Sequence, residues 1–307
     1  MWIFGGSSKP TDTDSKNSTG VVGVPTKRPQ APAKGVSVDP AGYFPRYGYP
    51  IPVHDLESRQ EYVSCYNRAL RAPSWVIEHL TPQSRTGGEG VDRSKSHFME
   101  DTAIPQLFRA RLADYFRSGY DRGHMAPAAN AKFNQNALNE TFYLTNMSPQ
   151  VGEGFNRDYW AHFERFVRNL TSKYASVRVV TGPLYLPRRD KATNKWVVSY
   201  EVIGNPPNVA VPTHFFKILI GEDPILPSLP RNGVAVSAFV LPNEKISNST
   251  PLESFAVPVN AIERAVGAEF MPKLPEKNRR DMCKEITCAV EVVEFNDAVK
   301  SLPPPRK

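Results

Sequence analysis

The sequence predicts an α+β fold in which helices flank a mixed, mainly antiparallel central sheet. Short segments rich in β-branched and aromatic residues recur between turn signals, and several of them alternate apolar with polar side chains. Few segments have the apolar spacing of a helix, and strands and helices do not alternate as a parallel βαβ sheet requires. With 40% hydrophobic residues in 307, the chain can bury a sizeable core.

Composition divides the chain into three parts. Residues 5–42 are rich in Ser, Thr, Lys, Gly and Pro and contain no aromatic residue, so residues 1–42 are predicted to be a disordered tether. A folded domain is predicted over residues 43–298. The Pro-rich end of the chain, SLPPPRK, predicts a tail over residues 299–307.

The strands of the sheet are predicted from their alternation and from their β-branched and aromatic residues. In chain order they are residues 62–67, 74–80, 176–181, 196–202, 213–220, 234–241 and 289–295. The first two are expected to be successive antiparallel strands. His79 and His214 lie within strands, where a structural role outweighs a catalytic one. Pattern alone leaves the order of the strands open.

Two segments carry the apolar stripe of an amphipathic helix. Residues 258–266 place Val259, Ile262 and Val266 on one side, and residues 155–170 repeat apolar residues at helical spacing. The connections differ in composition. They are an aromatic and Pro-rich extended arm from Tyr43 (YFPRYGYPIP), a polar Gly-containing loop at 84–100 that exposes Arg93 and His97, a short helix or turn at 108–115, and a basic linker at 272–280.

The charge of the chain favours a polyanionic partner. Lys and Arg number 38 against 31 Asp and Glu, a formal net charge of +7. Such a surplus suits nucleic acid or anionic lipid, although a basic protein without such a partner accounts for the charge about as well.

The cysteines, Cys65, Cys283 and Cys288, are too few for a disulfide framework and lack zinc-site spacing. Cys283 and Cys288 could pair locally, but the odd count predicts three thiols.

The sequence predicts no membrane span, because no apolar run reaches eighteen residues. The opening MWIFGG is too short for the core of a signal peptide, and no Arg-rich amphipathic transit helix follows it. We therefore expect an N-terminus from which a targeting segment has been removed.

The segment DRGH at residues 121–124 combines the groups that phosphodiester hydrolysis needs. An imidazole ordinarily titrates near neutrality, so His124 suits a general base for water. The guanidinium of Arg122 can bind two non-bridging phosphate oxygens. Gly123 is expected to let the backbone bend and bring His124 forward, and Asp121 is expected to be a backbone or turn partner. Each residue alone could be an ordinary surface residue, but their adjacency favours a site.

Asn156 and Glu164 lie eight residues apart in the predicted helix over residues 155–170. Two turns of helix leave them roughly 80° from coincident, so both can face one site. Asn156 falls at the helix start, where unpaired backbone donors favour phosphate. Asparagine at such a position is more often a cap, and only the DRGH segment shifts the balance toward a metal ligand.

Together, DRGH and LTNMSPQVGEGFNRDYW resemble the DNA/RNA non-specific endonuclease family, which has a ββα-metal active site. The sequence is most similar to the mitochondrial endonuclease G branch, and FYLTNMSPQVGEGFNRDYWAHFE resembles its fungal mitochondrial nucleases. The similarity begins near Asp39 and includes TGPLYLP, YEVIGNPP and VPTHFFK. The resemblance therefore implies that the domain at residues 43–298 is a nuclease.

The resemblance also implies a role for each matching position. His124 matches the general-base histidine, and Asn156 matches the asparagine that binds the metal. Glu164 matches the acidic residue that holds a metal-bound water. Arg122 matches the arginine that contacts the phosphate.

Two further positions match the family less directly. Asn146 matches the asparagine of a leucine-x-asparagine segment and is expected to orient the site. Arg93, in GVDRSKSHF, is the best candidate for a second arginine on the phosphate side.

The resemblance implies Mg²⁺, exchangeable with Mn²⁺, as the cofactor, and cleavage of DNA and RNA into 5′-phosphate and 3′-hydroxyl ends. Weak sequence selectivity and a steep dependence of binding on salt are expected where contacts go to phosphate and sugar. A homodimer and a mitochondrial location are also implied, with release to the nucleus left open.

Two other functions stay open on the sequence. One is a basic protein that binds nucleic acid without cutting it, and the other is a phosphodiesterase of related fold that acts on small nucleotides. A phosphate-cradling loop is excluded, because neither GGEG nor GEG is followed by the GK[ST] that such a loop needs.

Overall fold

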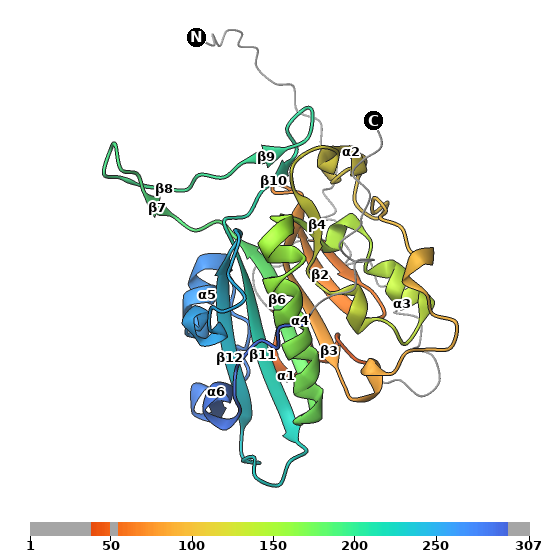
Figure 1. Cartoon of the computed structure of the whole chain (residues 1–307), viewed down its shortest axis with the longest axis vertical. Coiled ribbons are helices and arrows are strands. Elements are labelled where there is room, and N and C mark those ends of the chain that lie inside the picture. The colour runs from red at the N-terminus through yellow and green to blue at the C-terminus, as the bar shows by residue number, and fades with distance from the viewer. Residues whose placement is uncertain (1–37, 50–54, 294–307) are drawn as a thin grey trace, which may run out of the picture.

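The computed structural model describes residues 38–49 and 55–293 and contains a seven-stranded central sheet in the order β1-β2-β3-β6-β11-β12-β13. Every neighbouring pair is antiparallel except β12 and β13, which are parallel. The strands are β1 Asp55–Ser58, β2 Tyr62–Asn67, β3 Ala72–Leu80, β6 Tyr174–Leu184, β11 His214–Pro224, β12 Val234–Pro242 and β13 Arg279–Asp281. The predicted α+β class with a mainly antiparallel sheet is confirmed (Figure 1).

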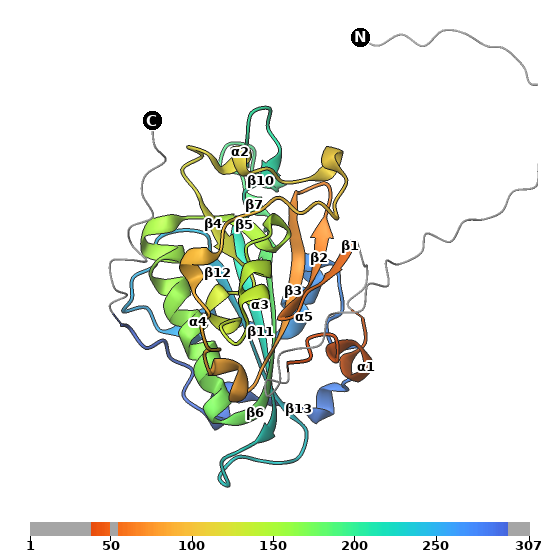
Figure 2. The same cartoon turned by 90° about the vertical axis from the view of Figure 1, so that its right-hand side faces the viewer.

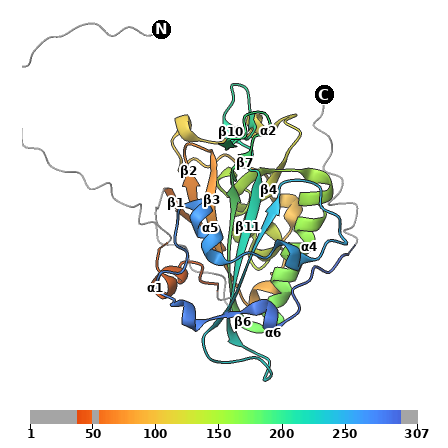
Figure 3. The ribbon, with the colours of Figure 1, turned by 90° about the vertical axis from the view of Figure 1, so that its left-hand side faces the viewer.

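Helices cover both faces of this sheet. Helix α4 (Tyr159–Asn169) lies on one face, and α1 (Tyr43–Tyr47) and α5 (Val259–Val266) lie on the other (Figures 2 and 3). Successive side chains of a strand point to opposite faces, so neighbouring residues enter different layers. Phe215 packs in the core on the α4 side, whereas Phe216 packs in the core under α1 and α5.

The strands predicted at 62–67, 74–80, 176–181, 213–220 and 234–241 are confirmed as β2, β3, β6, β11 and β12, and the helix at 258–266 as α5. Two strand predictions are wrong. Residues 196–202 form no single strand. They contribute to two small ladders outside the central sheet: β7 Arg188–Arg189 with β8 Trp196–Val197, and β9 Val202–Ile203 with β10 Val209–Ala210.

The last strand of the sheet is β13, which lies partly in the segment predicted to be a basic linker. Residues 289–293 form no strand, and 294–295 lie outside the described residues. The three residues of β13 pair with the exposed edge of β12, from Val234 to Val236. Pairing with an existing edge supplies the hydrogen bonds, so neither alternation nor β-branched residues were needed there.

The predicted extended arm begins with a helix instead. Aromatic residues at helical spacing make α1 bury one side, and the rings of Tyr43 and Tyr47 lie 4.9 Å apart. The Tyr47 hydroxyl donates to the carboxylate of Glu222, which fixes α1 to the sheet. Residues 50–54 of the arm lie outside the described residues.

Residues at the start of the described chain contact the folded body. Val38 is buried, and the backbone N–H of Asp39 donates to Nδ1 of His79 at 2.8 Å. The other ring nitrogen of His79 is hydrogen-bonded to Ser176, which confirms a structural role for this histidine. Residues 38–42 had been assigned to the tether. The remainder of that segment and the tail at 299–307 lie outside the described residues.

The prediction of three thiols is wrong, because Cys283 and Cys288 form a disulfide. Helix α6 (Met282–Glu285) and the turn after it bring their Cα atoms to 5.3 Å, within the range that a disulfide spans. Cys65 is buried in β2. In the part of the chain that the structure describes, no helix has the length and apolar character needed to cross a membrane.

Candidate active site

A two-stranded hairpin and the helix that follows it form the site. Strand β4 (Asp121–His124) pairs antiparallel with β5 (Met147–Gln150), and a wide turn, Gly152–Asn156, connects β5 to α4. The short helix α2 (Leu112–Tyr115) precedes β4, and α3 (Gln135–Glu140) lies in the long connection between β4 and β5. The unit therefore has a ββα arrangement built from one continuous region of the chain (Figure 1).

His124 lies in an aromatic setting that keeps its imidazole neutral. Its ring centroid is 5.6 Å from that of Phe98 and 4.9 Å, edge to face, from that of Phe142. Its Nε2 is buried and has no hydrogen-bond partner among the residues described. Burial, followed by the positive charges of Arg93 and Arg122, lowers the pKa of His124 to about 3. The imidazole is therefore available as a proton acceptor at neutral pH.

The same two phenyl rings carry the two candidate arginines. The guanidinium carbon of Arg122 lies 4.2 Å from the Phe98 centroid, and that of Arg93 lies 5.5 Å from the Phe142 centroid. Each ring thus contacts His124 and one cation. The structure brings Arg93 and Arg122, which are distant in sequence, to the two sides of one imidazole.

Asn156 precedes the helix, so the prediction that it shares α4 with Glu164 is wrong. The helix begins at Tyr159, and Asn156 is the last residue of the turn Gly152–Asn156. Gly154 has a φ of +79°, and its N–H donates to the Asp158 carboxylate at 2.6 Å. Asp158, with φ −130° and ψ −100°, is not helical, so the regular helical spacing is interrupted between positions 156 and 164.

Asp121 holds the side chain of Asn156. The Asn156 amide nitrogen donates to Asp121 Oδ2 at 2.9 Å, and Arg157 Nε donates to the same oxygen at 2.8 Å. Asp121 is therefore a side-chain partner, not the backbone or turn partner predicted from the sequence. The bond directs the amide nitrogen toward β4 and leaves the amide oxygen as the group available to a cation.

The donor set suits a hard cation that keeps most of its water. In residues 38–49 and 55–293, no group of three or more His, Cys, Asp or Glu could hold a metal. A single oriented amide oxygen, with carboxylates nearby, fits Mg²⁺, which commonly binds few protein oxygens and several waters. The same set does not fit zinc, which takes a full shell of nitrogen and sulfur ligands.

Glycine is required at position 123 by packing, and not by the backbone bend that was predicted. Its φ is not among the positive values, so the strand makes no left-handed bend there. A Cβ at Gly123 would instead collide with the buried side chain of Gln150. Glycine thus lets β4 and β5 pair closely next to His124.

Asn146 fixes the backbone that follows His124. It is fully buried, its Oδ1 accepts from the Ala126 N–H at 2.9 Å, and its Nδ2 donates to the carbonyls of Ala126 and Thr141 at 2.9 and 2.8 Å. All three hydrogen bonds of the amide group go to the protein chain. This geometry supports the orienting role expected of Asn146.

Glu164 lies on α4 and is in electrostatic contact with Arg93. Burial raises the pKa of Glu164, and the cations Lys217, Arg168 and Arg93 counteract that rise. Lys217 is itself buried in β11 and donates to the Thr181 hydroxyl at 2.8 Å. These cations favour the carboxylate form that a role toward metal-bound water needs.

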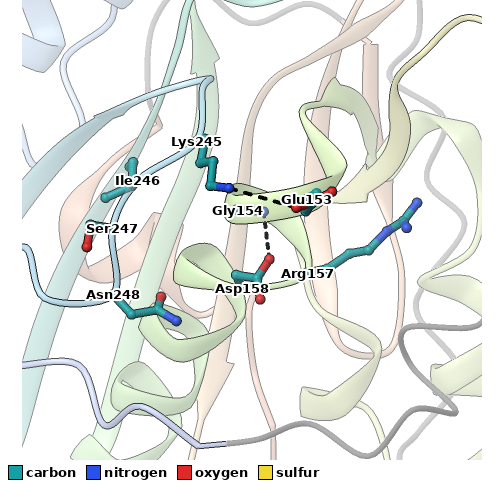
Figure 4. Close-up of a pocket in the computed structure, with 8 residues that line it drawn as sticks. All are labelled: Glu153, Gly154, Arg157, Asp158, Lys245, Ile246, Ser247 and Asn248. Carbon is teal, nitrogen blue, oxygen red and sulfur yellow. Dashed lines mark hydrogen bonds and ion pairs between the residues drawn. The ribbon is translucent and has the colours of Figure 1, made fainter.

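A depression of about 570 Å³ adjoins the turn (Figure 4). It is lined by Glu153, Gly154, Arg157, Asp158 and residues 245–248. Lys245 makes an ion pair with Glu153 at 3.8 Å, and the Ile246 N–H donates to the Gly154 carbonyl at 3.0 Å. The loop at 245–248 therefore supports the turn that ends in Asn156.

Sequence reasoning missed Phe98, Phe142 and Arg157 as parts of the site. Arg157 follows Asn156 directly, and this adjacency to a candidate metal ligand is the only feature of the sequence that indicates a role for it in the site. Phe98 and Phe142 lie in separate segments with no periodicity in common. Nothing in the sequence pattern could indicate that their rings meet at His124.

Comparisons with known proteins point in one direction. The family model described as DNA/RNA non-specific endonuclease matches residues 40–277. The mitochondrial nuclease of Saccharomyces cerevisiae is 55% identical over 292 residues, which cover 92% of this chain and 88% of that protein. Mitochondrial endonuclease G of Homo sapiens is 43% identical, covering 76% of this chain and 74% of the human protein.

A solved structure agrees with these sequence relatives. The crystal structure of an EndoG/EndoGI complex, which concerns the mechanism of EndoG inhibition, contains a chain that superposes with a TM-score of 0.73. The two chains are 43% identical, and the match covers 80% of this chain and 98% of that one. The resemblance and the fold class predicted from the sequence are confirmed.

Proposed function

Because this chain belongs to the DNA/RNA non-specific endonuclease family, we propose that it hydrolyses DNA and RNA with one Mg²⁺, or Mn²⁺, and leaves 5′-phosphate and 3′-hydroxyl ends. One observation carries this proposal. Strand β4 presents a neutral imidazole between two guanidinium groups, while Asp121 of the same strand orients the amide of Asn156. A base, phosphate-binding cations and a cation-binding oxygen are thus gathered around strand β4.

Each side chain has a defined task in this mechanism. His124 takes a proton from the attacking water, which then adds in line to phosphorus. Arg122 and Arg93 bind the non-bridging oxygens and stabilise charge where it develops. Asn156 would hold the metal directly and Glu164 through a water, and a bound metal would supply positive charge for the hydrolysis of the phosphodiester. Contacts to phosphate and sugar carry no base code, so both DNA and RNA are accepted.

Cleavage assays in the presence and absence of metal test the proposal. We expect nicking of supercoiled plasmid and fragmentation of RNA with Mg²⁺, and neither reaction after addition of EDTA. Binding of the plasmid with no cleavage in Mg²⁺ would favour the nucleic-acid-binding alternative. Faster turnover of a dinucleotide than of a long duplex would favour a small-nucleotide phosphodiesterase. End-labelling of the products identifies the 5′-phosphate.

A homodimer is part of this proposal, supported by an exposed apolar face. The β7–β8 hairpin extends from the body of the molecule (Figure 1), and Trp196 is 69% exposed. Val198, Tyr200 and Val202 are exposed as well and follow Trp196 at every second residue, so an extended chain presents them together. Such a face is costly to leave in water, and a second copy of the chain would cover it.

Replacing Trp196 with Ser is expected to shift the protein from dimer to monomer. Sedimentation velocity at micromolar concentration measures the change. Leu107→Ser is the matched control, because Leu107 is 76% exposed and lies outside the hairpin. A wild-type protein that sediments as a monomer, or a loss of dimer in both variants, contradicts a dimer through this face.

We also place the protein in mitochondria, on the names of its relatives from yeast and human. Release to the nucleus stays a prediction. Fractionation of cells that carry the tagged chain tests both locations.

A further inference from the structure

The side chain of Asn243 connects three parts of the molecule at the start of the turn. Asn243 follows the last residue of β12, and its backbone N–H donates to the Thr213 carbonyl at 2.9 Å. Its Oδ1 accepts from the Val151 N–H at 2.9 Å. Its Nδ2 donates to the carbonyls of Pro149 and Pro212 at 3.1 and 2.9 Å. The central sheet is thus joined to β5 through one amide group.

An amide is the group that this position requires. The β4–β5 ladder ends at the pair Asp121 and Gln150, so the N–H of Val151 needs a partner outside the ladder. The carbonyls of Pro149 and Pro212 need donors at the same point. Asparagine offers an acceptor and two donors within one short side chain, and all three are used.

Val151 makes the hydrogen bonds that hold the start of the turn. Its carbonyl accepts from the Asn156 N–H at 2.9 Å, so the two ends of the turn are joined through Val151. The Gly152 carbonyl accepts from the Arg157 N–H at 3.0 Å. Asn243 therefore fixes the start of the turn, and the turn fixes the backbone of Asn156.

The loop after Asn243 holds the middle of the same turn. The Ile246 N–H donates to the Gly154 carbonyl at 3.0 Å, and Lys245 lies against Gly154 and Glu153 (Figure 4). The turn is consequently held at its start, in its middle and, through Asp121, at the side chain of Asn156.

We propose that Asn243 is a positioning residue for metal binding: it holds the turn so that the Asn156 amide oxygen meets the cation. The inference rests on the proposed function, because it assigns the cation to Asn156. The hydrogen bonds of the Asn243 side chain go to backbone groups. Its effect passes through Val151 to the backbone of Asn156.

Asn243→Asp is the sharpest test, because it keeps the size and the acceptor but removes both donors and places a carboxylate against two carbonyl oxygens. Hydrogen–deuterium exchange without metal is measured on a peptide that covers residues 149–158. We expect faster exchange there by roughly tenfold or more, because the links to the Pro149 and Pro212 carbonyls are lost and the new carboxylate repels both oxygens, which loosens the chain that carries Val151 and the turn. Affinity for Mn²⁺, measured by electron paramagnetic resonance, should fall roughly 10- to 100-fold, as for other residues that orient a metal ligand.

Ile262→Ala is the matched control for a general loss of stability. Ile262 is fully buried on α5, in the core on the other face of the sheet from α4. Its truncation should lower the melting temperature while leaving exchange in residues 149–158 and Mn²⁺ affinity close to wild type. The Mg²⁺ concentration at half-maximal plasmid cleavage should rise for Asn243→Asp and stay constant for Ile262→Ala.

The outcomes separate this inference from the proposed function. Wild-type exchange in the turn, or wild-type Mn²⁺ affinity, in Asn243→Asp overturns the positioning role. Equal weakening of Mn²⁺ binding in Ile262→Ala overturns it as well, because the effect is then one of stability. If the wild-type protein binds Mn²⁺ but does not cleave nucleic acid, the proposed function fails and the positioning role stands.

Discussion

Replacing His124 with Ala is expected to lower plasmid cleavage at saturating Mg²⁺ by roughly 10²- to 10⁴-fold, the range contributed by a general base. In the proposed mechanism the imidazole, which is neutral near Arg93 and Arg122, is the base, and alanine leaves no group there that can accept the proton of the attacking water. The rate constant for nicking under single-turnover conditions measures the loss. Binding of DNA in EDTA should be almost unchanged, because the two arginines remain.

His97→Ala is the matched control for this change. His97 is an exposed imidazole in the same loop as Arg93, and it neither stacks on Phe142 nor lies on β4. Its replacement should change the rate by less than about tenfold, within the effect of a phosphate contact. Full activity of His124→Ala would remove His124 as the base.

The pKa of His124 makes the pH profile informative. A pKa lowered to about 3 means that folding favours the neutral form, so the stability that His124 contributes is present above its ordinary pKa of 6.5 and is lost as pH falls toward 3. Cleavage should therefore show no titration of this histidine near pH 6.5. A pH–rate profile from pH 5 to 8, with the metal kept saturating, measures this. A fall in rate on the acid side, centred near pH 6.5 and absent in His124→Ala, would contradict the lowered pKa of His124.

Replacing Asn156 with Ala is expected to reduce cleavage at millimolar Mg²⁺ by roughly 10²- to 10³-fold, comparable with loss of one oriented donor to a developing charge. In the proposed mechanism the amide supplies the oxygen for the metal, and alanine also frees Asp121 from its hydrogen bond at 2.9 Å. Higher Mg²⁺ should recover part of the rate, since the substrate phosphate still attracts the cation. Initial rates over a Mg²⁺ titration check this.

Two further variants isolate the pairing of Asn156 with Asp121. Asn156→Asp alone places two carboxylates against each other and should also impair cleavage. The double variant Asp121→Asn and Asn156→Asp again pairs one amide with one carboxylate. It should therefore be more active than the single variant Asn156→Asp. Asn169→Ala, at the end of α4, is the control and should behave as wild type. If the double variant gives no recovery, the hydrogen bond between positions 121 and 156 is not what orients the ligand.

Much of the sheet was readable from the sequence, because its central strands are short runs of β-branched and aromatic residues bounded by turn signals. The strands at 213–220 and 234–241 are such runs, helix α5 repeats apolar residues at helical spacing, and the structure confirms all three. Arg122 and His124 were singled out from the sequence by their adjacency, and the structure places both on β4, where residues two apart lie on one face. These features depend on neighbours along the chain.

The remaining features depend on which distant segments meet. Strand β13 exists because β12 offers an open edge, and the disulfide exists because a turn brings Cys283 to Cys288. Asn156 was assigned to the helix because its apolar spacing extends to residue 155, yet the non-helical backbone of Asp158 makes the helix start later. Periodicity records how much each side chain is buried, not which backbone groups bind one another.

By itself, the sequence determined the fold class, the DRGH motif and the family, because each depends on local order and spacing. Only the tertiary structure decided that Phe98 and Phe142 bring two arginines to His124, and that Asp121 and Asn243 hold Asn156 and its turn. The physical reason is that hydrogen bonds and ring contacts between distant segments form only once the sheet has set their separation. Side-chain type specifies what a residue can bind, and packing specifies what lies within its reach.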